Sequence, residues 1–194
     1  MATKKVIDAG RRVFANLKAL IFTPWTDENT LGDTSYDLVN IVGDTTSVEQ
    51  ADNNVNALEH EFSSEPLYEN VQLGDKTFTT ECIDFQNDVL KQLMGWEVAE
   101  DGTAFAPIQY KDLYCKIEMQ FNSTDDVVVL PKVKMNSKSI LSSMKTDASR
   151  NTLSGTCYSA FVKSGEVENE TDYAVIPKAN VATYGVSATA TVSV

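Results

Sequence analysis

The sequence predicts a mainly β fold, an antiparallel β-sandwich or barrel with one flanking α-helix and an extended arm or loop. Three observations lead to this prediction: short segments that alternate apolar and polar residues recur along the chain, turn residues separate them, and one segment alone has clear helical periodicity. Strands joined by short turns, and not by alternating helices, favour antiparallel sheets. At 194 residues and 42% apolar content, the chain is long enough to bury a sizeable core.

We divide the chain into two parts, an N-terminal arm/strand and loop over residues 1–35 and a single β domain over residues 36–194. Within the second part, residues 43–66 form a polar, acidic excursion that is too long for a tight turn. We interpret this excursion as an arm or an extended hairpin.

Residues 4–22 allow two interpretations. Some of their apolar positions suit a helix, whereas the alternation over residues 12–22 favours a strand, and we expect the strand. Pro24 would end it. The apolar face of this strand would carry Val13, Ala15, Leu17, Ala19 and Ile21.

Residues 67–82 predict a hairpin. Residues 67–73 form one extended run, Gly74-Asp75 has the composition of a tight turn, and residues 77–82 alternate as a strand.

A helix is expected directly after this hairpin, over residues 84–95. Asp84 can cap its first turn, and Gly95 stands where a C′ residue is expected. One face is apolar, so the helix must lie against a sheet. That face consists of Phe85, Val89, Leu90, Leu93 and Met94.

The remaining strands follow from alternation. Residues 113–121 give the cleanest period-two pattern in the chain, and residues 127–135, 151–162 and 184–194 give further strands. Pro131 lies inside one of them, which predicts an edge position or a bulge there.

Charge and composition exclude several classes of function. The formal net charge is −12, so affinity for nucleic acid through its phosphates is not expected. No apolar run reaches 18 residues and no signal peptide is seen, so we expect neither a membrane span nor secretion. Basic residues concentrate only near the N-terminus, where we interpret them as a solvated arm: Lys4, Lys5, Arg11, Arg12 and Lys18.

No catalytic residue, cofactor site or metal site is predicted. The three cysteines, Cys82, Cys115 and Cys157, lie in expected strands without CxxC spacing, which indicates buried reduced thiols. His60 is the one imidazole of the sequence and stands between two glutamates, where a half-buried structural histidine is expected. Motifs for phosphate binding or for an activated nucleophile are absent from the sequence.

The order of these segments resembles the tail tube (major tail) proteins of long-tailed bacteriophages, which are similar in fold to the tube proteins of contractile injection systems. The resemblance spans roughly residues 36–194. It is carried by an acidic stretch, a hairpin, a helix and a series of alternating strands. Its most specific parts are Leu93-Met94-Gly95-Trp96 and the segment LPKVKM over residues 130–135.

The resemblance implies a non-enzymatic structural virion protein that assembles into stacked rings, usually hexameric, which form the hollow tail tube. DNA would pass through the negatively charged bore without specific binding. Partners would be further copies of the chain, other tail proteins at the tube ends and, in a contractile tail, a sheath. Assembly would take place in the bacterial host cytoplasm, and no cofactor would be needed.

The resemblance also implies residue roles. The helix over residues 84–95 would pack on the outside of the barrel, and the arm would contact a neighbouring subunit or ring. The arm residues expected at that contact are Asp52, Asn54, Glu59, His60, Glu61 and Phe62.

Other classes of protein fit the same β architecture. One alternative is another phage structural protein, namely a head-tail connector, a capsid decoration protein or a fibre domain. A second is an enzyme, in which Glu59, His60 and Glu61 would have to converge with another acid in a pocket. A third is a carbohydrate- or peptide-binding β-sandwich.

Overall fold

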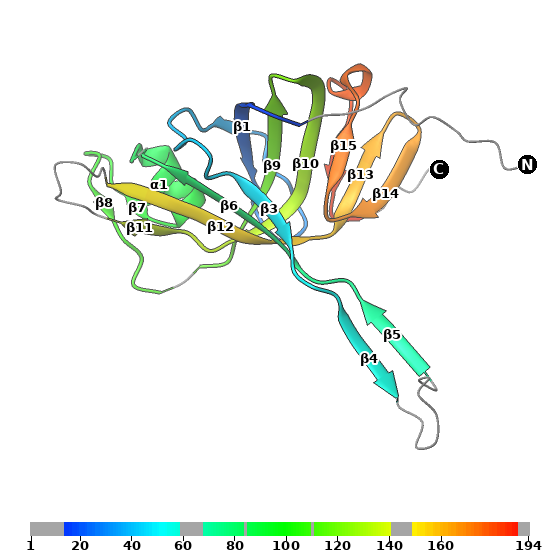
Figure 1. Cartoon of the computed structure of the whole chain (residues 1–194). Coiled ribbons are helices and arrows are strands. Elements are labelled where there is room, and N and C mark those ends of the chain that lie inside the picture. Colours follow the sequence, from blue (N-terminus) through cyan, green and yellow to red (C-terminus); the bar gives the residue numbers. More distant parts are fainter. Residues whose placement is uncertain (1–13, 59–67, 84, 110, 141–148, 190–194) are drawn as a thin grey trace, which may run out of the picture.

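The computed structural model describes residues 14–58, 68–83, 85–109, 111–140 and 149–189. Over these residues the protein is mainly β with antiparallel sheets, as the sequence predicts (Figure 1). No helix among them is long and apolar enough to span a membrane. The elements are β1 (Leu17–Pro24), β2 (Tyr36–Asp37), β3 (Ser47–Gln50), β4 (Asn54–Leu58), β5 (Tyr68–Gln72), β6 (Lys76–Cys82), α1 (Asn87–Met94), β7 (Glu97–Val98), β8 (Ala104–Phe105), β9 (Leu113–Phe121), β10 (Thr124–Met135), β11 (Lys138–Ile140), β12 (Arg150–Tyr158), β13 (Ala160–Ser164), β14 (Val167–Thr171), β15 (Ala174–Ile176), the 3₁₀ turn η1 (Lys178–Asn180) and β16 (Gly185–Ser187).

The main sheet runs in the order β2-β1-β9-β10-β12-β6-β3 and closes on itself through residues 36–42. At one end of this segment, β2 pairs with β1, and Leu38 N donates to Leu20 O at 2.9 Å. At its other end, Val42 N donates to Glu81 O of β6 at 2.8 Å. A single short segment therefore joins both sides of the sheet, and the sheet becomes a barrel.

The barrel interior holds one apolar cluster to which β1, β6, β9, β10, β12 and α1 contribute. Phe22 of β1 and Phe78 of β6 meet edge to face, with ring centroids 6.1 Å apart, and neither is exposed. Leu93 brings the face of α1 into the same cluster. Each fully buried side chain of this size contributes about 1.5–3 kcal/mol relative to an exposed one. The barrel is therefore the stable body from which the rest of the chain projects.

Strand β10 belongs to two layers. Its second half pairs with β12, whereas its first half pairs with β15 and turns Val127 and Val129 toward a second apolar cluster. That cluster includes Val162 of the three-stranded sheet β14-β13-β16, so the small sheet packs against the outside of the barrel. The change of partner coincides with Pro131. The register with β9 shifts between Leu130 and Val133, so the predicted bulge at this proline is confirmed.

The N-terminal strand is present, but the predicted apolar face is wrong. The register between β1 and β9 shifts between Leu17 and Ala19. This irregularity turns Leu20 and Phe22 into the core, where both are fully buried, and leaves Ile21 half-buried on the other face. The predicted end of the strand at Pro24 is confirmed, since β1 ends at this residue. The division of domains at residue 35 stays a prediction, although β1 pairs with β9 of the main sheet.

The predicted hairpin over residues 67–82 is wrong. Strand β5 pairs with β4, and β6 pairs with β3 and β12, so β5 and β6 follow each other without reversing the chain. The helix is shorter than expected and begins at Asn87; Asp84 lies outside the described residues. Gly95 adopts the left-handed conformation at φ 71° that the C′ position requires.

Candidate functional site

The most prominent feature outside the barrel is a two-stranded ribbon, which we call the arm (β4 and β5). The chain leaves the barrel through β3, continues into β4, returns through β5 and re-enters through β6, and Figure 1 shows the ribbon projecting away from the body. The register pairs Val55 with Val71 at its centre. Residues 47–58 and 68–82 thus form one long antiparallel hairpin that bends where it leaves the barrel.

The bend depends on Gly74. A Cβ at this position would lie 2.1 Å from the carbonyl oxygen of Ala51 and 2.6 Å from that of Asp52, so only glycine permits this approach of the two backbones. Hydrogen bonds hold the crossing on both sides: Ala51 N donates to Asp75 O at 2.9 Å, and Gly74 N donates to Asn53 Oδ1 at 3.3 Å. Gly74 therefore serves as a crossing point, where the sequence suggested a turn.

A salt bridge ties the base of the arm to the C-terminal part of the chain. Lys76 Nζ lies 2.5 Å from Asp172 Oδ2, and the two side chains are 19% and 32% exposed. Asp172 follows β14 directly, so the contact joins the first residue of β6 to the small sheet. The direction of the arm is therefore fixed from two sides, by the crossing at Gly74 and by this pair.

The arm presents apolar side chains to solvent. Val55 and Val71, which stand opposite each other, are each 51% exposed, and Leu73 is 72% exposed. An isolated two-stranded ribbon is at best marginally stable in water. A ribbon of this kind with an exposed apolar pair has the character of a contact surface, because covering it would remove apolar area from water.

The predicted contact residues of the arm are only partly described. Asp52 lies at the crossing and Asn54 begins β4, and both are exposed. Glu59, His60, Glu61 and Phe62 lie outside the described residues. Their role at a subunit contact stays a prediction.

The predicted helix face lies inward. Val89, Leu90, Leu93 and Met94 are buried in the barrel cluster, and Phe85 packs against it half-buried. Ser137 Oγ donates to the carbonyl of Leu93 at 3.0 Å, which helps to anchor the C-terminal end of α1. This face supports the fold and is not available to a partner.

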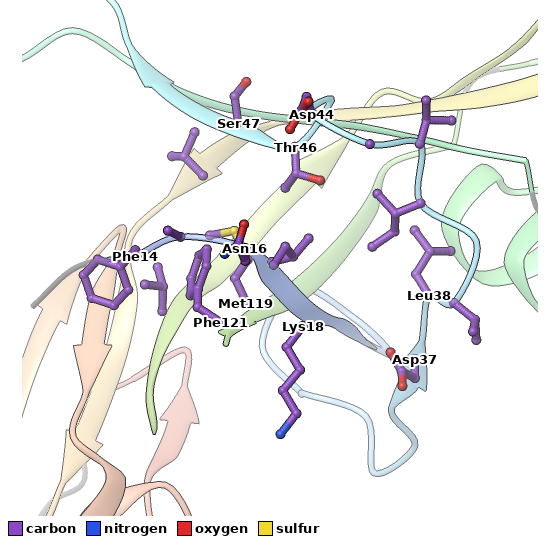
Figure 2. A pocket seen from close by; sticks show the side chains of 18 of the residues that line it. Phe14, Asn16, Lys18, Asp37, Leu38, Asp44, Thr46, Ser47, Met119 and Phe121 are labelled. Atoms are coloured by element: carbon purple, nitrogen blue, oxygen red, sulfur yellow. The ribbon is translucent and has the colours of Figure 1, made fainter. Parts of the chain in front are cut away.

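A cavity of about 930 Å³ lies beside the barrel, between the start of β1 and the start of β3. We call it the seam. Figure 2 shows Asp44, Thr46 and Ser47 along one wall and Phe14 and Asn16 on the other. Its apolar lining includes Met119, Phe121 and Val128, and its charged lining residues in the described part of the chain are Asp37, Asp44 and Lys18.

The seam exists because the barrel closes at one end only. Residues 36–42 connect β1 to β6 only on the C-terminal side of Ala19. Within this segment, the ladder between β2 and β1 is limited to Ile21 and Phe22. Strand β3 is the last strand on its side of the sheet. In the part of the chain that the structure describes, the outer backbone edges of Leu17, Lys18 and β3 therefore face the seam without a paired strand.

The titratable groups of the described residues do not form a reactive centre. No cluster of His, Cys, Asp or Glu among them could hold a metal ion. The three cysteines are free and buried, as predicted. Burial raises the pKa of Cys115 to about 12; burial and the charge of Asp172 raise the pKa of Cys157 to about 11. Both thiols are thus protonated and unreactive at neutral pH.

One buried polar group joins the two layers. Burial, and then its contact with Glu118, raise the pKa of Tyr184 well above its usual range. Lys116 Nζ lies 2.6 Å from Glu118 Oε1 and 5.2 Å from the centre of the Tyr184 ring. The charges of Lys116 and Glu118 neutralise each other, and the Tyr184 hydroxyl stays protonated beside them, so these contacts link β9 to the residue just before β16.

No protein-family model matches the chain, and no curated protein matches it. Among solved structures, it is similar to a chain of the anti-feeding prophage (AFP) baseplate, determined by cryo-EM with 6-fold symmetrisation. The likeness covers 92% of this chain and 99% of that chain, with 10% sequence identity and a TM-score of 0.43. A likeness of this degree assigns neither a family nor a function to the chain.

Three features of the site were missed at the level of sequence. The sequence could have indicated the pairing of Val55 with Val71, because NVNAL and YENVQ are two segments of strand length on either side of a polar stretch. The close approach of the two backbones at Gly74 could not be predicted from the sequence, because a glycine next to an aspartate is equally typical of a turn. The seam could not be predicted either, because it depends on which strands, distant in sequence, lie at the edges of the sheet.

Proposed function

We propose that the chain is a structural subunit that assembles with copies of itself into stacked rings, and that these rings form the tube of a phage-tail-like particle. The observation that carries the proposal is the arm. Its direction is fixed at its base, yet its apolar side chains Val55, Val71 and Leu73 are exposed to solvent. A neighbouring subunit supplies the missing cover. The resemblance in the order of segments supports the same assembly.

Charge supports a tube through which DNA passes. Between Lys18 and Lys76 the sequence has no Lys or Arg and has twelve Asp and Glu residues. Such a surface repels phosphates, so nucleic acid would move along it without binding. In this proposal the rings are hexameric and the acidic surfaces contribute to the bore.

Electron microscopy of the purified protein tests the assembly. Negative-stain images at high concentration should show rings or tubes of uniform bore. Trimeric fibres, or particles that bind only a preformed capsid, would replace the tube with a fibre or decoration role. Monomers at every concentration would remove the proposal.

A variant of the arm tests the contact. Val55→Asp combined with Val71→Asp places two charges on the exposed pair, so rings should be lost while the unfolding transition of the barrel stays the same. Val167→Asp is the matched control, because Val167 of β14 is 61% exposed and lies outside the arm. Light scattering and denaturant unfolding give the two readouts. If the arm variant still forms rings, the subunit contact does not depend on Val55 and Val71.

A further inference from the structure

The seam combines a cavity, two unpaired backbone edges and an acidic rim. A strand placed in it would pair on one side with the start of β1 and on the other with β3, and its inward side chains would cover Met119, Phe121 and Val128. The strand edges that line the seam are short, Leu17 and Lys18 of β1 and Ser47 and Val48 of β3, so a short extended segment would suffice to pair with both. Strand addition to an exposed edge is a common mode of peptide recognition.

The charges of the seam favour a basic occupant. Among the described residues, Asp37 and Asp44 line it and Lys18 is the one cation. The arm of another copy is acidic, so its charge disfavours it as the inserted strand. Residues 1–13 have the complementary composition, with four basic residues, one acidic residue and the apolar pair Val6-Ile7.

The start of the described chain indicates which copy supplies this segment. Asn16 has a left-handed backbone with φ 58°, which turns the chain at the end of β1. Ala15 then exchanges two hydrogen bonds with Ser123 Oγ, at 2.8 and 3.0 Å, and Phe14 meets Phe121 edge to face. Figure 1 shows this stretch passing from β1 across the ends of β9 and β10. The chain therefore leaves β1 on the side of the β9–β10 turn, where Ser123 and Phe121 hold it.

We propose that the seam binds residues 1–13 of a second copy of this chain as an inserted β-strand. The inserted strand completes the barrel of the receiving copy, and the basic side chains face Asp37 and Asp44. The proposal rests on the proposed self-assembly and deepens it, because it names the receiving surface and the segment that fills it. In this arrangement each subunit gives one segment and receives another, so the contact can repeat along a ring or between rings.

Cross-linking between two populations of the full chain tests the proposal. One population carries Ile7→Cys and the other Val39→Cys, at the rim of the seam, where Val39 is 75% exposed. A short bifunctional maleimide links the two thiols without requiring an exact register. The native cysteines give little background, because all three are buried. The expected result is a covalent dimer that contains one copy of each variant.

Two controls give the result its meaning. Val167→Cys places the thiol on β14 at a position that is also exposed, at 61%, and its yield with the Ile7→Cys population should be at least five times lower. Asp44→Lys added to the Val39→Cys copy should lower the yield at least threefold, because it removes the charge match. No dimer, equal yields at both valines or an unchanged yield after Asp44→Lys would each overturn the proposal. So would a cross-link formed within single copies that carry both Ile7→Cys and Val39→Cys.

Images of the same samples separate this inference from the proposed function. Rings without the cross-link would overturn the seam as the receiving surface while the assembly stands. The cross-link in samples that form only dimers would support the seam and would contradict the tube.

Discussion

Replacing Gly74 by alanine should release the arm without unfolding the barrel. The added Cβ would lie 2.1 Å from the carbonyl oxygen of Ala51, whereas ordinary contact begins near 3.4 Å, so the two backbones must separate by about 1 Å. This movement breaks the bond from Ala51 N to Asp75 O and the one from Gly74 N to Asn53 Oδ1. The separation relieves the clash, so the cost is that of the two lost hydrogen bonds, at about 1–1.5 kcal/mol each, or about 2–3 kcal/mol locally.

Amide hydrogen exchange measures this cost where it arises. A local loss of about 2–3 kcal/mol should accelerate exchange of the Ala51 amide by about 30- to 150-fold. Global unfolding in denaturant should change by less than about 1 kcal/mol, because the crossing lies outside the apolar core. Since the arm would no longer keep its direction, assembly should fail.

A matched control is Gly185→Ala in β16, where an added Cβ would meet no atom within 4 Å. This variant should exchange, unfold and assemble like the parent chain. Unchanged exchange at Ala51 in Gly74→Ala, with normal tubes, would refute the crossing as the element that directs the arm.

Three further predictions concern the barrel and its thiols. Leu90→Ala should cost about 2–5 kcal/mol in denaturant unfolding, because Leu90 is 4% exposed in the core, whereas Lys91→Ala on the exposed face should stay within about 0.5 kcal/mol. Asp172→Asn removes the partner of Lys76 and should speed amide exchange at the start of β6. Ring formation should change little if the crossing at Gly74 alone keeps the direction of the arm. Burial raises the pKa of Cys115 from 9.0 to about 12, so the folded state holds this proton more tightly than the unfolded state does; stability should fall as pH rises from 9 toward 12 and should not depend on this group below pH 8. A Cys115→Ala variant that shows the same alkaline loss would assign that loss to other groups.

Features that depend on neighbouring residues could be predicted from the sequence. The alternation of residues 113–121 gives β9, Gly95 ends α1 in the expected left-handed conformation, and Pro131 marks the bulge of β10. Each is a local consequence of side-chain period or of backbone freedom. The sequence also indicated that the helix would lie against a sheet, since one face of it is apolar.

Features that depend on long-range pairing could not be predicted. Gly74-Asp75 has the composition of a turn, yet β6 gains more by pairing with β3 and β12 than by folding back on β5. The bulge between Leu17 and Ala19 reverses the buried face of β1, and nothing in the local alternation indicates it. The closure by residues 36–42 and the seam beside it follow from the same distant contacts.

The pairing of the first strand with β9 has a consequence for synthesis on the ribosome. Ala15 and its partner Ser123 are separated by 108 residues. At about 5–20 residues per second, β9 follows β1 after roughly 5–20 s. During that interval the two-residue strand β2 is the one partner of β1 that has been made, and the barrel cannot close. A subunit therefore acquires its assembly surfaces only late in translation, which separates the folding of each copy from its first encounter with another.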